Sequence, residues 1–137
     1  MKALSTAIVS KLTGSTLNTY INGRLYKNKA PLKPEFPYAV FSLISDVPDN
    51  VFAQKGETYL IQFDLFSIAS GSTEIEDMYT NLKSLYDDCS LSPTGELVCG
   101  FERVNAILLT DDMVTPPGAQ TLWHYAVDYE VTIQYTS

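Results

Sequence analysis

Apolar and polar residues alternate along the last part of this chain. Between residues 122 and 135, aromatic and β-branched residues occupy every second position. Successive side chains of a strand point to opposite faces, so this alternation predicts one long strand with an apolar side and a polar side. An unpaired strand with an aromatic face would promote aggregation, so we expect it to pair within a sheet. The apolar side carries Trp123, Tyr125, Val127, Tyr129, Val131, Ile133 and Tyr135.

Three further segments, rich in β-branched and aromatic residues, are predicted to be strands. They cover residues 37–45, 57–68 and 100–110. The segment 57–68 is apolar on both faces near its end, which favours a central place in the sheet. Residues 24–26 are compatible with a brief additional strand. The segments 46–55 and 111–120 contain Pro and Asp and are interpreted as exposed loops.

Two segments have the apolar spacing of amphipathic helices. In the first, residues 3–12, Leu4, Ile8 and Leu12 fall on one face. The second follows Ser72 or Thr73, and Thr73 with Glu76 fits the spacing of a capping box. Its apolar stripe consists of Ile75, Met78, Tyr79, Leu82, Leu85 and Tyr86.

The order of elements is therefore helix, strand, strand, helix, strand, strand. A helix with one apolar stripe must cover one face of a sheet. The strand pairs are joined by loops of about ten residues, which favours antiparallel neighbours. We predict an α+β fold, a single domain over residues 1–137, with a four-stranded antiparallel sheet covered by two helices on one face.

Size and composition are those of a folded domain. The chain has 137 residues, of which 45% are hydrophobic. No apolar run approaches the ~20 residues that a membrane helix needs, and the first residues do not resemble a signal peptide. We expect synthesis in the cytosol and no membrane association. In that reducing compartment Cys89 and Cys99 are expected to be free thiols rather than a disulfide.

Charge is unevenly distributed. The net charge is −7, but residues 1–34 contain six Lys or Arg and no acid, whereas the remainder has three basic and sixteen acidic residues. The ordinary interpretation is a solvated acidic surface crossed by a basic N-terminal element. The more specific one is docking of the basic part of one subunit against the acidic body of the next. Specific nucleic-acid binding is disfavoured because it requires a net basic domain.

No set of residues typical of catalysis stands out. His124 is the only histidine, and it shares a predicted strand face with Asp128, so a His–carboxylate pair is geometrically possible. The chain lacks a nucleophile-elbow pattern, a glycine-rich phosphate motif and metal-ligand spacing. We therefore expect no enzymatic activity, no cofactor and no metal. The alternative from another class is a small ligand-binding protein or hydrolase that uses His124 with Asp128.

Candidate functional residues are instead those suited to protein–protein contact. Phe52, with Val51, is an apolar residue in a polar loop, and aromatic residues are favoured anchors of interfaces. The charged candidates are Lys27, Lys29, Lys33, Asp111 and Asp112.

Several of these features occur together in one known family. An N-terminal helix leads to Gly-Arg-Leu-Tyr at 23–26, then Ala30-Pro31 and Phe36-Pro37-Tyr38-Ala39-Val40-Phe41. The strand Ile61-Gln62-Phe63-Asp64-Leu65-Phe66 runs into a helix after a small-residue turn, and a terminal strand alternates in aromatics. In these respects the chain resembles the tail-completion, or tail-terminator, proteins of long-tailed bacteriophages.

That resemblance implies a structural virion protein, assembled in the host cytoplasm, that forms a ring, by analogy a hexamer. The ring would lie on the head-proximal end of the tail tube, stop its polymerisation and present its other face to the neck, or head-completion, protein. DNA would pass through without specific binding, since an acidic ring interior offers phosphates no cations. A neck or head-completion ring protein of the same phage type is the nearest alternative.

Overall fold

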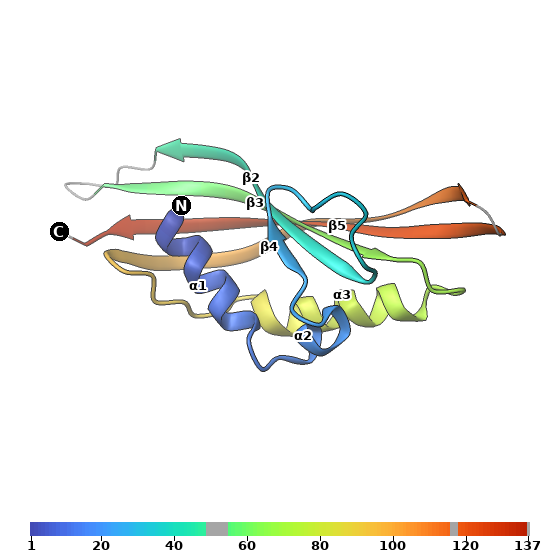
Figure 1. Ribbon diagram of the computed structural model, residues 1–137. Helices are drawn as coiled ribbons and strands as arrows, with labels where there is room; N and C mark the ends of the chain where they lie inside the picture. Colours follow the sequence, from blue (N-terminus) through green and yellow to red (C-terminus); the bar gives the residue numbers. More distant parts are fainter. Residues whose placement is uncertain (49–54, 116–117, 137) are drawn as a thin grey trace.

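The computed structural model describes residues 1–48, 55–115 and 118–136 and shows one sheet with helices on a single side (Figure 1). The helices are α1 (Lys2–Leu12), α2 (Thr16–Ile21) and α3 (Thr73–Tyr86). The strands are β1 (Leu25–Lys27), β2 (Tyr38–Pro48), β3 (Gly56–Ser67), β4 (Glu96–Thr115) and β5 (Gly118–Tyr135). Their order across the sheet is β1-β2-β3-β5-β4, so β3 is central, as predicted.

The α+β class is confirmed, but the predicted four-stranded antiparallel sheet with two helices is wrong. The described residues form five strands, and the extra one, β1, pairs in parallel with β2 through Leu25 and Ala39. Asn22 and Gly23 both have positive φ angles and turn the chain from α2 into β1. A three-residue strand is too short for a side-chain alternation to reveal, which is why the pattern did not separate it from a loop.

The additional helix, α2, has six residues and begins at a side-chain cap. Asn18 donates its backbone N–H to Oγ of Ser15 over 3.1 Å. The cap satisfies one of the free N–H groups at the helix start, so a short segment can be helical. Leu17 and Ile21 are buried on its inner side.

The predicted loop at 111–120 is also wrong. Asp111 pairs with Leu122 and Asp112 with Thr121, so β4 and β5 continue as a two-stranded hairpin. Pairing between β5 and β3 ends at Trp123 with Ser67, so beyond that point β4 and β5 have only each other. We call this projection, residues 110–115 and 118–122, the arm. Figure 1 shows it extending past the N-terminal end of α3.

The helices and the sheet enclose the hydrophobic core. The stripes predicted for α1 and α3 are confirmed at Leu4, Ile8, Leu12, Ile75, Met78, Leu82 and Tyr86, which are all buried. Phe63 on β3 stacks on Tyr86 with ring centroids 4.8 Å apart and meets the edge of Tyr129 at 5.6 Å. The Tyr86 hydroxyl donates to the carbonyl of Ile8 over 2.8 Å, which ties α3 to α1. We call this helix-packed side the covered face.

The predicted capping box of α3 takes a different form. Ser72 is the N-cap residue and makes no side-chain bond to the helix backbone; its Oγ donates to Glu76 over 3.3 Å. Ser67, at the end of β3, donates to Glu74 over 2.6 Å. The start of α3 is therefore held by side-chain carboxylates, and acidic residues in a first turn also suit the helix dipole.

Candidate assembly surfaces

The side of the sheet away from the helices, which we call the open face, carries a row of rings that crosses three strands and ends at a leucine on a fourth. The pairing register aligns Tyr38 of β2, Phe66 of β3, His124 of β5 and Leu109 of β4. Tyr38 stacks on Phe66 with centroids 4.7 Å apart, and Phe66 stacks on His124 at 4.4 Å. The rings cover one another in part: Tyr38 is buried, whereas Phe66 and His124 are half-buried.

His124 does not form the predicted pair with Asp128. Its Nε2 lies 2.7 Å from Oδ1 of Asp64, whereas Asp128 accepts a hydrogen bond from Gln62 over 2.9 Å. Asp64 and Gln62 lie on β3, so the sheet register decides both partners. Within residues 1–48, 55–115 and 118–136, no three His, Cys, Asp or Glu side chains gather as a metal site.

Elsewhere on the open face, among uncharged residues, the charged residues are acids. The side chains on the same face of the sheet as the rings include those of Asp64, Asp128, Glu130 and Glu102. In the described part of the sheet, no residue whose side chain points to the open face is Lys or Arg. The open face therefore has aromatic rings at one end and carboxylates beyond them.

One edge of the sheet is formed by β4, which pairs only with β5. Val104, Ile107 and Leu109 are large apolar residues of this strand, exposed to 52%, 48% and 47%. The predicted candidates Asp111 and Asp112 are exposed on the same strand, as is Glu102. None of the three acids has an ion-pair partner in the described ranges. We call residues 102–112 the acidic edge.

The opposite edge is β1 together with the loop that follows it. The predicted candidates Lys27, Lys29 and Lys33 are all exposed, and none forms an ion pair with a described residue. Leu32 between them is 91% exposed. Arg24, by contrast, is used internally: it donates to the carbonyls of residues 36 and 37. We call residues 27–33 the basic loop.

Two predicted candidates, Val51 and Phe52, lie outside the described residues. The structure adds exposed apolar candidates: Ile107 and Leu109, which lie in the strand predicted at 100–110, and Leu32, which lies outside every predicted strand. The continuous apolar run at 106–109 was the available signal. A strand that is apolar on both faces must be buried on both or must meet a partner.

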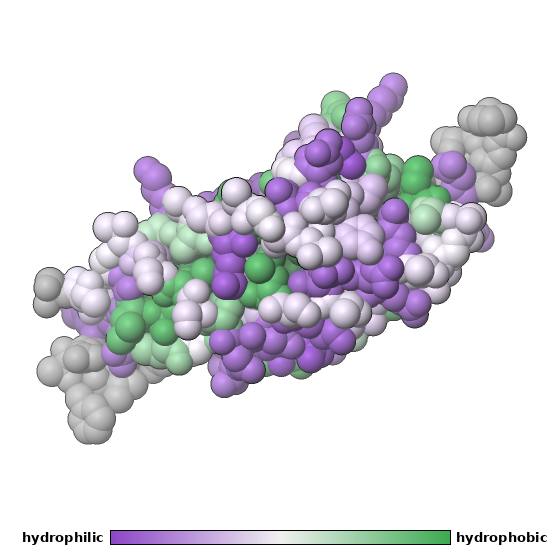
Figure 2. All heavy atoms as spheres, turned by 90° about the horizontal axis from the view of Figure 1, so that it is seen from below, coloured by the Kyte–Doolittle hydropathy of each residue, from purple (hydrophilic) through white to green (hydrophobic). Residues whose placement is uncertain are grey.

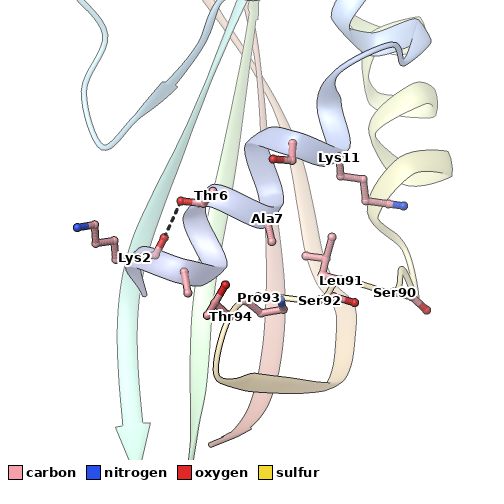
Figure 3. A pocket seen from close by; sticks show the side chains of 11 residues that line it. Lys2, Thr6, Ala7, Lys11, Ser90, Leu91, Ser92, Pro93 and Thr94 are labelled. Carbon is pink, nitrogen blue, oxygen red and sulfur yellow. Dashed lines mark hydrogen bonds between the residues drawn. The ribbon is translucent and has the colours of Figure 1, made fainter. Parts of the chain in front are cut away.

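A depression lies on the helix side, between α1 and residues 90–94. It has a volume of about 830 Å³ and is broadly open to solvent. Figure 3 shows Ala7 facing Leu91 and Pro93 across it, while the amines of Lys2 and Lys11 extend away from each other. Its polar side chains do not converge on one point, so this depression does not resemble a small-molecule binding site. The helix side as a whole shows hydrophobic areas separated by hydrophilic ones (Figure 2).

Cys89 and Cys99 are free thiols, as predicted. Burial raises the pKa of the Cys89 thiol to about 11, so it is protonated and unreactive at neutral pH. Among the described helices, none combines the length and the apolar character needed to cross a bilayer.

Solved structures share this architecture. One chain of the structure described as "Virion of native gene transfer agent (GTA) particle" superposes with a TM-score of 0.75 at 9% identity, covering 96% of this chain and 94% of that chain. A second solved structure matches with a TM-score of 0.55 at 13% identity, covering 95% of this chain and 94% of that chain. No protein-family model matches the sequence, and no curated protein does. At these identities the likeness establishes a common fold.

Proposed function

We propose that this protein is a structural subunit of a phage-like virion and forms a ring at the head-proximal end of the tail tube. The observation that carries the proposal is the near-complete overlap with a chain of a virion particle, at a TM-score of 0.75. The sequence motifs at 23–66 point independently to tail-terminator proteins. In this role the subunit performs no chemistry; it stops tube growth and joins the tail to the neck.

The surfaces of the molecule suit that role. A subunit of a ring between two other assemblies needs side-to-side contacts and two further faces. The sheet offers two charged edges with exposed apolar residues, and its open face adds a row of rings bordered by carboxylates. Facing a channel, the acidic open face would repel DNA phosphates and let DNA slide.

Native mass spectrometry tests the ring directly. We expect a dominant species at six times the subunit mass of 15.2 kDa. A protein that stays monomeric at micromolar concentration and above would contradict the proposal.

The position of the ring requires its partners. Purified ring should be mixed with polymerising tail tube protein from the same genome and observed by negative-stain electron microscopy. We expect shorter tubes, each with a ring at one end. Tubes of unchanged length without an attached ring would contradict the terminator role, and attachment only to isolated neck complexes would support the head-completion alternative instead.

A further inference from the structure

The two edges of the sheet carry opposite charges, and apart from Arg103 of the acidic edge, which pairs with Asp87, these charges have no ion-pair partner among the described residues. The basic loop has three exposed lysines and the acidic edge has three exposed acids, and neither set forms an ion pair with described residues of its own chain. We propose that they bind each other in neighbouring copies: the basic loop of one subunit contacts the acidic edge of the next. The inference deepens, and rests on, the ring proposed above.

The register places these edges at the same height along the strands. Lys27 pairs with Phe41, Phe41 with Phe63, Phe63 with Val127, and Val127 with Ala106. One cross-sheet row therefore begins at the base of the basic loop and ends inside the acidic edge. Copies placed side by side with little shift along the strands bring the two edges together.

The contact also has an apolar part. Leu32 is 91% exposed within the basic loop, and Ile107 and Leu109 are about half exposed on the acidic edge. Exposed ion pairs contribute little stability individually. The apolar residues would therefore supply much of the affinity, whereas the charges would select the partner and fix its orientation.

Charge also determines the symmetry of the contact. Two acidic edges repel each other, and so do two basic loops, which disfavours a two-fold dimer through either edge. A contact between unlike edges is heterologous, and it closes into a ring when the rotation between subunits divides a full turn. Of the two described edges, the basic loop is therefore the one that complements the acidic edge of another copy.

Charge reversal tests the pairing. The basic-loop variant replaces Lys27, Lys29 and Lys33 with Glu. The acidic-edge variant replaces Glu102, Asp111 and Asp112 with Lys. Each alone should raise the dissociation constant of the ring at least about tenfold. A variant with all six changes should recover the ring, because its edges are complementary again.

Mixing the two triple variants provides the sharpest readout. A subunit with two acidic edges can join only a subunit with two basic edges, so native mass spectrometry should show alternating rings with equal numbers of each. The control K2E/K11E/K55E, which lies away from both edges, makes the same change in net charge as the Lys-to-Glu variant of the basic loop and should assemble like the wild type. Circular dichroism checks that every variant is folded.

The outcomes separate the two proposals. A wild-type protein that forms no ring overturns the proposed function itself. A wild-type ring that both triple variants form equally well overturns the edge pairing and leaves the ring intact. Loss of assembly without recovery in either the six-fold variant or the mixture also overturns the pairing.

Discussion

The covered face and the open face of the sheet use aromatic rings in different ways. On the covered face, Phe63 is 1% exposed and packs between Tyr86 and Tyr129 beneath the helices. Three residues later on the same strand, Phe66 lies on the open face and is covered mainly by the rings of Tyr38 and His124. The rings of the covered face stabilise the fold by packing in the core. The rings of the open face hold one another in place without a layer of helices above them, so part of their surface stays accessible.

Replacing one phenylalanine at a time gives the largest expected contrast. Phe63→Ala removes a ring from the closed core and should lower the free energy of unfolding by about 3–5 kcal/mol. Phe66→Ala should lower the free energy of unfolding clearly less, because the Phe66 ring is only half-buried and already borders solvent. Chemical denaturation followed by tryptophan fluorescence measures both, and equal losses would contradict the difference between the faces.

Removing a single hydroxyl tests the helix contact of the covered face. Tyr86→Phe deletes the buried bond to the Ile8 carbonyl and leaves that oxygen unpaired, which should cost about 1–2 kcal/mol. Tyr26→Phe on the open face is the matched control, since its hydroxyl makes no hydrogen bond with the described residues. A Tyr86→Phe variant as stable as this control would show that the bond to α1 contributes nothing.

His124→Phe separates stacking from hydrogen bonding on the open face. The new ring can still stack on Phe66, but Asp64 loses its partner at 2.7 Å. Because both side chains are partly exposed, the cost should stay below about 1 kcal/mol. Ring formation should be unchanged, and loss of the ring in a folded variant would assign His124 to an assembly contact.

The smallest expected effect concerns pH at the end of the covered face. Hydrogen bonds from Tyr135 and Tyr59 lower the pKa of Glu57 below its ordinary value of 4.5. A lowered carboxyl pKa adds stability above pH 4.5 that is lost as the pH falls through the folded-state value. Glu57→Gln should reduce stability at pH 7 by less than about 1 kcal/mol and flatten the acid limb of the stability curve. An unchanged acid limb would contradict this assignment.

Periodicity predicted the elements that bury one continuous side. The stripes of α1 and α3 and the alternation of β5 follow directly from side chains that face the covered core. The β1 strand was noted only as a possible brief strand at 24–26 and was left out of the predicted sheet, because three residues show no period. The arm was taken for a loop because Asp, Pro and Gly mark turns locally, whereas its strand character comes from pairing between segments.

The candidate surfaces were predictable in composition and not in placement. The charges of Lys27, Lys29, Lys33, Asp111 and Asp112 were apparent from the sequence, but only the strand order puts them on opposite edges. The partner of His124 could not be found from spacing, since Asp64 is 60 residues away; the register of β3 with β5 pairs it with Ala126, diagonally across from His124.

The two irregularities in β4 have a consequence of their own. Its pairing with β5 shifts between Val98 and Gly100 and again between Arg103 and Asn105. Each bulge interrupts the even spacing of backbone groups and increases the local twist. A strand of another molecule therefore cannot pair continuously with all 20 residues of this edge strand. The two shifts thereby disfavour amyloid-like stacking along this edge, even though no other strand covers it within the described residues.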